Sequence, residues 1–399
     1  MKAGAIVEHA SGLHGAPAAA VILRGARVAR SARRAEKADV AVARGRIRHI
    51  GRVAGRKGLD LSDCLILPGL INAHDHLDFS VFPRLGDGPY ETCGHWARDI
   101  RARFADAIDQ VRSIAREERL IWGGIRNLAC GVTTVCHHNP SHSVFARGFP
   151  VRVMRRFSWA HSLEFSPELA RSHAACPSTR PFIFHAGEAV NGAGRREMVT
   201  LARLGLFAPN SVLVHAVALD RDFLSLARQN GCALVWCPSS NMFILGRTLT
   251  REVLNSGLPV ALGTDSGISA EGDMLDELRF AQAISGLTEA RLYGMVTSGA
   301  ASVLRLADGE GSLSAGALAD FVVFRDAGQS PCEALFRQLP EAVFIGGRLQ
   351  LASEEFAART PEAEDFTPLS IQGRGRVRVR CRIPAMRPGI RLAGREVTV

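Results

Sequence analysis

The spacing of apolar and polar residues divides the chain into three parts. In residues 20–66, short apolar runs alternate with polar residues and are separated by glycine and arginine, which predicts a small antiparallel unit. From about residue 67 to 307, apolar strand-like runs alternate with segments of helical periodicity, which is typical of βα repeats around a parallel sheet. After Gly309 the strand pattern returns in GALADFVVFRD and EAVFIGGRLQLA.

The simplest α/β architecture with this order is a TIM-type (β/α)8 barrel joined to a small β-sandwich. We expect the barrel, as the catalytic domain, in residues 67–307, and the sandwich to be formed by both chain ends, residues 1–66 and 308–399. The helical segments are 97–120, 195–205, 221–230, 273–287 and 289–304. The barrel strands are expected within LILPGLINAHDHL, VTTVCHH, PVRVMRRFSWAHSL, RPFIFHAGE, NSVLVHAV, CALVWCP and LPVALGTDS.

These segments give seven barrel strands, one fewer than a complete barrel requires. About 46 residues separate Val135 from Phe182, which is little room for two complete βα units. The segment VRVMRRFSWAHSLEF, residues 151–165, therefore holds two strands, or one unit of the barrel is cut down. The sequence leaves both alternatives open.

The positive charge is concentrated at the C-terminal end. The net charge of the 399 residues is +10, and residues 371–399 carry eight arginines and one glutamate. Between Arg374 and Arg382 an arginine occupies every second position, which places the charges on one face of a strand. We expect a half-exposed edge strand. A nucleic-acid arm is the alternative, but no aromatic residue is interleaved to stack on bases, so we expect no nucleic-acid partner.

Signals for secretion or membrane insertion are missing from the sequence. Residues 1–17 contain no apolar core of a secretory signal, and the longest apolar runs, such as 16–23, are far shorter than the roughly 20 residues that span a bilayer. The nine cysteines are scattered and form no CxxC pair, which predicts reduced, mostly buried thiols. We therefore expect a cytoplasmic protein without a membrane partner, and a homodimer is the default oligomer.

Several predicted strands end in a residue that can bind a metal or move a proton. Such strand ends converge on one mouth of a (β/α)8 barrel. Imidazoles and a carboxylate there can hold a divalent cation, which lowers the pKa of a water to about 7 and provides a hydroxide nucleophile. A single histidine at a strand end is more often structural, so the prediction rests on the ordered series. That series is His74 and His76 in INAHDH, His185 and Glu188 in FIFHAGE, His215 in VLVHA and Asp265 in VALGTD.

These motifs resemble the metal-dependent amidohydrolase superfamily. HDH after LILPGLINA, then HAGE, VHA and GTDS are similar to the branch that contains cytosine and guanine deaminases, S-adenosylhomocysteine deaminase and the triazine hydrolases. Further similarity lies in ADVAVARGRIRHIG, WCPSSNMFILG, DMLDELRFA and GSLSAGALADFVVF, so the resemblance extends over roughly residues 20–350.

The resemblance implies a site with one divalent metal ion, usually zinc and sometimes iron. Glu188 would shuttle a proton from water to a ring nitrogen, and His215 would contact the attacking water without ligating the metal permanently. Asp265 would accept a proton from the hydroxide and pass it to the leaving group. The metal ligands implied are His74, His76, His185 and Asp265.

The implied reaction is the hydrolytic deamination of a small aminated heterocycle of the purine, pterin, pyrimidine or triazine type. Hydrolysis of an amide, a cyclic imine or a carbon–chlorine bond by the same hydroxide is the alternative. A nucleic-acid-binding protein with an inactive barrel is a distant alternative. It would require lost ligands, and none is lost.

Lysine content distinguishes between one-metal and two-metal sites. In two-metal members of the superfamily that the motifs resemble, a carbamylated lysine on a middle barrel strand bridges the ions. No lysine follows Lys57, which precedes the HDH motif, so that bridge is excluded here. A cysteine bridge through Cys136, at the end of VTTVC, stays conceivable, and a buried thiol is the alternative.

Other polar and aromatic residues follow the predicted strands and are candidates for substrate contacts. Residues 82–91, FPRLGDGPYE, form a loop rich in glycine and proline directly after the HDH strand, and such a loop is well placed to act as a lid. Tryptophans such as Trp159 and Trp236 could stack on a flat heterocycle, although core packing is more usual for that residue. The candidates for substrate binding are Arg84, Tyr90, Trp96, His138, His161 and Asn241.

Overall fold

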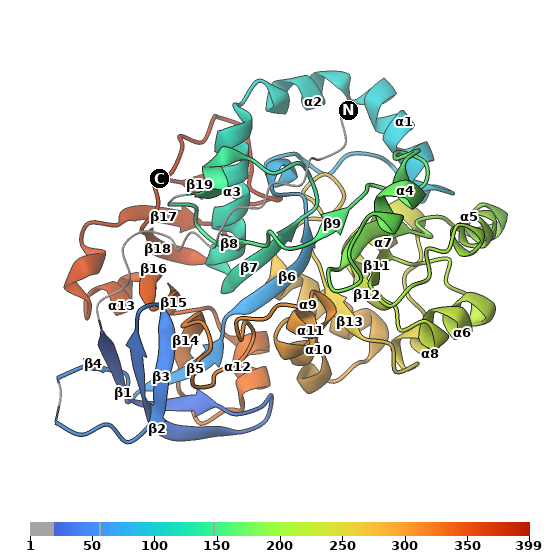
Figure 1. Ribbon diagram of the computed structural model, residues 1–399. Coiled ribbons are helices and arrows are strands. Elements are labelled where there is room, and N and C mark those ends of the chain that lie inside the picture. Colours follow the sequence, from blue (N-terminus) through green and yellow to red (C-terminus); the bar gives the residue numbers. More distant parts are fainter. Residues whose placement is uncertain (1–19, 56, 147) are drawn as a thin grey trace.

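The computed structural model describes residues 20–399 except Arg56 and Arg147, and its central part is a ring of parallel strands (Figure 1). The expectation about residues 1–17 lies outside this range. The strands of the ring are β6 (Leu70–Asp75), β7 (Val132–His137), β8 (Arg152–Val153), β9 (Ser158–Trp159), β10 (Phe182–Ala186), β11 (Ser211–His215), β12 (Ala233–Trp236) and β13 (Val260–Leu262). The expected TIM-type barrel is therefore confirmed.

The eight strands pair in two sets, β6-β7-β8 and β9 to β13 in order. The ring closes between β6 and β13 through a parallel bridge from Asp75 to Asp265. On the other side, β8 and β9 have two residues each, are separated by Met154–Phe157 and do not pair with one another. Residues 151–165 thus hold two strands, and the helix that would connect them is missing from this described segment, so both alternatives for the short unit apply.

Helices cover the outside of the ring, and most of them lie where the periodicity predicts them. The predicted segment 97–120 is divided among three helices, and 289–304 between two. The helices of the barrel are α1 (Cys93–Arg103), α2 (Ala105–Arg112), α3 (Arg116–Ala129), α4 (Leu169–Ala174), α5 (Asn191–Arg203), α6 (Arg221–Gln229), α7 (Pro238–Leu245), α8 (Arg251–Leu254), α9 (Met274–Ser285), α10 (Glu289–Met295) and α11 (Ser298–Val303), with single turns η1 (Leu77–Phe79) and η2 (Ser143–Ala146).

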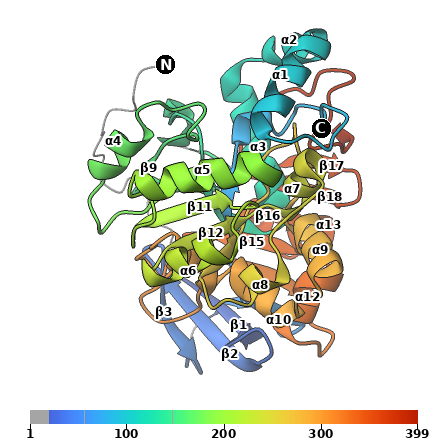
Figure 2. The same ribbon diagram turned by 90° about the vertical axis from the view of Figure 1, so that its right-hand side faces the viewer.

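Both chain ends join in a second sheet, of which β1 to β3 lie at the lower end of the molecule in Figures 1 and 2. Its order is β19-β17-β18-β16-β15-β14-β5-β1-β2-β3, and β4 pairs with β1. The strands are β1 (Val21–Ala29), β2 (Ala35–Ala43), β3 (Arg46–Gly51), β4 (Leu59–Asp60), β5 (Cys64–Pro68), β14 (Phe321–Arg325), β15 (Ala342–Ile345), β16 (Arg348–Ser353), β17 (Thr367–Ile371), β18 (Gly375–Val379) and β19 (Val397–Thr398); α12 (Pro331–Arg337), α13 (Glu354–Ala357) and η3 (Pro361–Ala363) accompany them.

Alternation of side chains in this sheet separates two cores. In β5, Leu65 and Leu67 point into the large core shared with the barrel, whereas Ile66 packs into a second core within the sheet. Strand β14 pairs with β5 and divides in the same way, with Val322 facing the barrel and Phe321 facing the second core. The sheet therefore positions the start of β6 by packing against the barrel on one face.

The arginine-rich segment forms a strand as predicted, but the prediction of an edge strand is wrong. Strand β18 pairs with β16 on one side and with β17 on the other. Val377 and Val379 are buried against the barrel core, while Arg378 pairs with Glu354 at 3.3 Å on the opposite face. The periodicity gave the strand and its two faces correctly, and the extra neighbour β17 comes from a segment without strong strand character.

The described helices include none with the length and apolar character needed to cross a bilayer. All nine cysteines are free thiols.

The C-terminal segment is attached to the barrel by a buried ion pair. The Arg374 guanidinium donates to both oxygens of Asp273, at 2.6 and 2.7 Å, and to Asp276 at 2.9 Å. The side chains of Arg374 and Asp273 are 5% and 4% exposed. Asp273 also caps the N-terminus of α9, so the pair connects β18 to the helix that follows the last barrel strand.

We predict that Arg374→Met lowers the free energy of unfolding by about 3–5 kcal/mol, because it leaves the Asp273 carboxylate buried without its partner. Arg376→Met changes an exposed arginine of β18 and should alter the free energy of unfolding by no more than about 0.5 kcal/mol. Urea unfolding of the two variants measures the difference. Equal stability of the two variants would contradict the structural role of the pair.

Candidate active site

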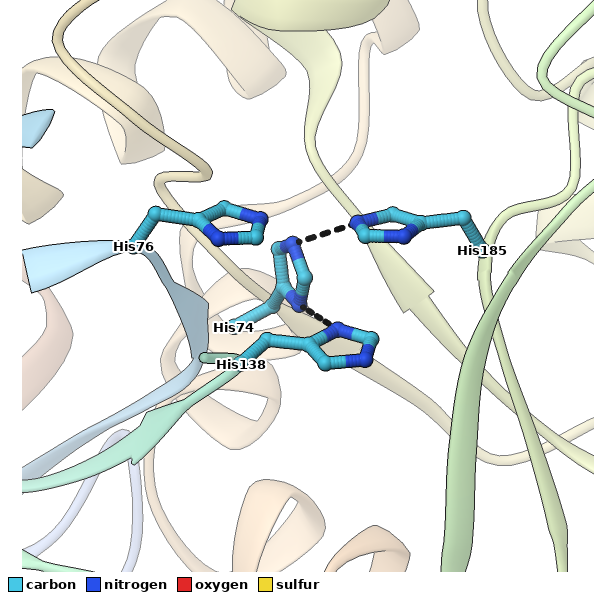
Figure 3. Close-up of side chains that lie close together, drawn as sticks. All are labelled: His74, His76, His138 and His185. Atoms are coloured by element: carbon cyan, nitrogen blue, oxygen red, sulfur yellow. Dashed lines mark hydrogen bonds between the residues drawn. The ribbon is translucent and has the colours of Figure 1, made fainter. Parts of the chain in front are cut away.

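The strand ends of the barrel bring four of the predicted residues into contact at one mouth. His74 in β6 lies between His76 and His185, as Figure 3 shows. The Nε2 atoms of His74 and His185 are 3.2 Å apart, and the Asp265 Oδ1 atom lies 3.4 Å from His74 Nε2 and 3.6 Å from His76 Nε2. Ligands at about 2.1 Å from one ion in tetrahedral geometry are about 3.4 Å apart, so these four side chains fit a single zinc-sized ion.

Each imidazole has one nitrogen that faces away from the site, its far nitrogen. The hydrogen bond at this atom determines which of the two ring nitrogens carries the proton. His185 Nδ1 lies 2.8 Å from the His161 carbonyl oxygen, which can only accept, so Nδ1 donates. His138 Nε2 donates likewise to the Ala160 carbonyl at 3.0 Å, and its Nδ1 therefore accepts from His74 Nδ1 at 3.2 Å. The proton of His74 and that of His185 are thus both on Nδ1.

This arrangement leaves two lone pairs facing each other across the site. Burial lowers the pKa of His74 to about 3 and holds the pKa values of His138 and His185 well below 6.5, so all three rings are neutral at neutral pH. The Nε2 lone pairs of His74 and His185 then face each other at 3.2 Å, which is repulsive unless a cation lies between them. The donor set therefore fits a divalent metal ion.

The Asp265 carboxylate is held asymmetrically. Its Oδ2 atom accepts hydrogen bonds from the hydroxyls of Ser269, at 2.7 Å, and of Ser240, while Oδ1 faces His74 and His76. Burial acts to raise the pKa of Asp265, but the neighbouring histidines hold it well below 3.8, so the carboxylate is ionised. Ser269, four residues after Asp265, carries no signal in the sequence.

Two of the chemistry-bearing residues have left-handed backbone conformations. The φ angles of His215 and Asp265 are 68° and 56°. This conformation costs a non-glycine residue about 1–3 kcal/mol and is concentrated at functional sites. Gly263 belongs to the same constraint, because a Cβ atom there would lie 2.8 Å from the Cβ of His74. The close approach of the segments that contain Gly263 and His74 places Asp265 beside His74.

His215 and Glu188 lie at the same mouth. His215 Nε2 is 3.7 Å from Glu188 Oε1, and its Nδ1 is 2.8 Å from the side-chain nitrogen of Asn241. Burial, supported by the charge of Asp265, raises the pKa of Glu188 well above 4.5, and burial lowers the pKa of His215 to about 4. Glu188 is therefore suited to hold a proton near neutral pH.

Two overlapping sets of four donors lie within 4.8 Å of one another, and His74 and His185 belong to both. His76 and His138 complete one set, and His215 and Asp265 complete the other. Cys136 is in neither of these sets from the described residues. Its thiol is fully buried among apolar side chains such as Ile71 and Ile183, and burial raises its pKa, which favours the buried-thiol alternative.

The candidate substrate contacts in the loop after β6, Arg84 and Tyr90, and Trp96 in α1 all contact protein partners. Trp96 is buried and donates to the Leu85 carbonyl, and Tyr90 donates to Asp99 at 2.6 Å. Arg84 is partly exposed, with its guanidinium over the Phe243 ring at 4.7 Å and 3.8 Å from Glu271.

The remaining candidates lie next to the proposed ligands. The His161 carbonyl accepts a hydrogen bond from His185, and the His138 ring accepts one from His74. The Asn241 side chain contacts His215. Trp236 is fully buried, as in the core-packing alternative.

The same loop is bonded to three other loops of the mouth. The amides of Leu85, Tyr90 and Cys93 donate to the carbonyls of Ile268, Ile244 and Glu188, respectively. These acceptors follow β13, β12 and β10, so residues 85–93 connect the loops around the site. The loop therefore lies at the mouth of the barrel, and its action as a lid stays a prediction.

Comparison with known proteins gives matches along most of the chain. The family model described as "Amidohydrolase family" matches residues 154–349. A 5-methylthioadenosine/S-adenosylhomocysteine deaminase from Syntrophobacter fumaroxidans is 27% identical, covering 73% of this chain and 80% of that protein. The deaminase of the same name from Halobacterium salinarum is 28% identical, covering 68% and 75%.

Solved structures share the fold. An adenosine deaminase from Xanthomonas campestris with bound zinc superposes with a TM-score of 0.63 and 20% identity, covering 86% of this chain and 97% of that chain. An atrazine chlorohydrolase from Arthrobacter aurescens complexed with zinc gives a TM-score of 0.65 and 18% identity, covering 83% and 95%.

Fold and site together define a metal-dependent hydrolase built on a (β/α)8 barrel. Residues 154–349 match the amidohydrolase family model, in agreement with the resemblance carried by the HAGE, VHA and GTDS motifs, and the chain is a hydrolase that acts on carbon–nitrogen bonds. A divalent metal is its cofactor.

We predict that Ser269→Ala weakens zinc binding about 10- to 100-fold, because Asp265 loses a hydrogen bond that orients its free oxygen toward the histidines. Ser225→Ala alters an exposed serine of α6 and serves as the matched control, with unchanged affinity. Competition with a chelator of known affinity measures both. Equal zinc affinity of the two variants would show that Asp265 does not need Ser269 to face the metal.

Proposed function

We propose that this chain is a mononuclear metal-dependent deaminase, which hydrolyses the exocyclic carbon–nitrogen bond of a small aminated heterocycle. The observation that carries the proposal is the pair of imidazole lone pairs facing each other at 3.2 Å, with a third imidazole and a carboxylate oxygen beside them. We assign His74, His76, His185 and Asp265 as the ligands of one ion and propose zinc, with iron as the alternative.

The metal, when bound, supplies Lewis acidity that lowers the pKa of a water to about 7. Glu188 then acts as the general acid and base. Its raised pKa lets it carry a proton to a ring nitrogen while the carbon is attacked. His215 Nε2, 3.7 Å from Glu188, orients the attacking oxygen, and the Asp265 carboxylate takes the proton that is passed to the leaving ammonia.

Deamination is favoured over the alternative hydrolyses because Glu188, a buried carboxyl group whose pKa is raised by burial, lies next to the site. A ring nitrogen needs such an acid as the tetrahedral centre forms. The relatives named as deaminases of 5-methylthioadenosine and S-adenosylhomocysteine support an aminopurine as the first substrate to test. The neighbour named as an atrazine chlorohydrolase keeps carbon–chlorine hydrolysis as the second candidate reaction.

Other properties of the protein are proposed with this function. We assign residues 67–307 to the catalytic domain and residues 1–66 and 308–399 to the β-sandwich, since β5 and β14 join both ends in one sheet. The nine free thiols support a reducing compartment such as the cytoplasm. The substrate is a small molecule, and a homodimer is the expected oligomer.

Metal analysis of the purified protein tests the one-metal site. We predict close to one equivalent of zinc or iron per chain, because His74 and His185 belong to both possible donor sets and no lysine is available for a bridge. Removal with a chelator should abolish turnover, and one added equivalent should restore it. Two bound ions per chain, or none after reconstitution, would rule out the mononuclear site.

We predict that Glu188→Gln retains the metal and loses turnover by about 10²–10⁴-fold, because the amide cannot carry the proton. Glu168→Gln, an exposed carboxylate, is the control and should behave as the parent protein. Turnover is measured as ammonia release from aminopurines, pterins, aminopyrimidines and aminotriazines, with chloride release from chlorotriazines in parallel. Undiminished turnover in Glu188→Gln would remove Glu188 from its proposed role.

A further inference from the structure

A chain of hydrogen bonds leads from the core of the barrel to His215. The indole nitrogen of Trp236, in the fully buried strand end of β12, donates to Thr248 Oγ1 at 2.6 Å. The Thr248 hydroxyl donates to Asn241 Oδ1 at 3.4 Å, and the Asn241 amide nitrogen lies 2.8 Å from His215 Nδ1. Thr248 follows α7, and Asn241 lies within it, so three positions in one stretch of chain converge on the histidine.

The direction of this chain is set at its start. An indole N–H can only donate, so Thr248 accepts from Trp236. The Thr248 hydroxyl proton then needs an acceptor, and the described residues offer it Asn241 Oδ1. With its oxygen toward Thr248, the Asn241 side chain presents its NH₂ group to His215. The reverse orientation would leave Thr248 accepting twice, with its own proton without a protein acceptor in the described part of the chain.

His215 thereby differs from the histidines that face it. In His74 and His185 the far nitrogen, Nδ1, donates a hydrogen bond, which leaves Nε2 with a lone pair. In His215 the far nitrogen accepts, which leaves the proton on Nε2. Nε2 is the atom that lies 3.7 Å from Glu188, and a protonated nitrogen cannot ligate a metal.

We propose that Trp236, Thr248 and Asn241 form a positioning relay that holds His215 as an Nε2–H donor and so excludes it from the metal. Distance alone places His215 with His74, His185 and Asp265 in one possible ligand set. With a protonated Nε2, His215 cannot be a ligand in that set. It instead donates a hydrogen bond to the oxygen that becomes negatively charged as the substrate carbon is attacked. This inference rests on the proposed function and specifies the role of one residue in it.

Asn241→Asp is the most direct test, because it replaces the NH₂ donor by a carboxylate oxygen at the same place. An oxygen can only accept there, so the His215 proton moves to Nδ1, and Nε2 gains a lone pair directed at the site. We expect turnover to fall about 10²-fold or more while zinc binding is retained or becomes tighter. Asn255→Asp, which makes the same change in charge at an exposed position after α8, is the control.

A second pair of variants separates the relay from general stability. Thr248→Val removes the hydroxyl at nearly constant volume, so Asn241 is no longer held in one orientation and turnover should fall about tenfold. Thr248→Ser restores the hydroxyl and should rescue most of that loss. If Asn241→Asp and Thr248→Val lose zinc and turnover in parallel, the residues support only the structure of α7, and the relay is contradicted.

The tautomer itself can be read in the zinc-loaded protein by ¹⁵N NMR of labelled histidines, with the His215 signals assigned by their loss in His215→Gln. We expect a protonated Nε2 and an unprotonated Nδ1 in the parent protein, and the opposite in Asn241→Asp. A protonated Nδ1 in the parent protein would overturn the inference. This reading does not depend on turnover, so a wrong substrate class would leave it valid, whereas failure to bind zinc at all would instead refute the proposed function.

Discussion

Two backbone hydrogen bonds between the ends of β6 and β13 close the barrel, and the same two bonds bring Asp265 next to the HDH motif. The His76 amide donates to the Asp265 carbonyl at 2.8 Å, and the Asp265 amide donates to the His74 carbonyl at 3.1 Å. Without this pairing Asp265 would not reach the HDH motif, and its left-handed backbone would have no compensation. Gly263 makes the approach possible because a side chain at that position would collide with His74.

The polarity of hydrogen bonds then assigns different chemistry to side chains of the same type. The Ala160 and His161 carbonyls fix the protons of His138 and His185 directly, and the Ala160 carbonyl fixes the proton of His74 through His138. Asn241 does the reverse for His215. The roles of the histidines in the site therefore depend less on their distance from a common centre than on what the nitrogen facing away from the site contacts.

Much of the fold and the proposed ligand positions could be predicted because both depend on local periodicity. Apolar runs that end in His74, His185, His215 and Asp265 are visible in the sequence, and the parallel barrel brings their ends together. Ser269 and Thr248 could not be found, since an isolated hydroxyl has no pattern and acts only through a three-dimensional contact. The donor direction at each imidazole was beyond prediction for the same reason.

The C-terminal segment shows another limit of periodicity. Alternating arginines predicted a strand with a charged face, but pairing with β17 depends on residues 367–371, TPLSI, whose strand is recognisable only beside its partner. Several arginines of this segment form ion pairs within the fold, and Arg374 reaches the cap of α9. Near that cap, the Gly272 amide donates to Ala393, and Ala393 donates to Ser80, so the chain end also touches the loops after β13 and β6.

A crystal structure of the zinc-loaded protein, with anomalous diffraction at the zinc edge, tests the central claim most directly. The account predicts one anomalous peak about 2.0–2.2 Å from the Nε2 atoms of His74, His76 and His185 and from Asp265 Oδ1, with His138 and His215 outside bonding distance. A second peak, or a bond from the ion to His138 or His215, would contradict it.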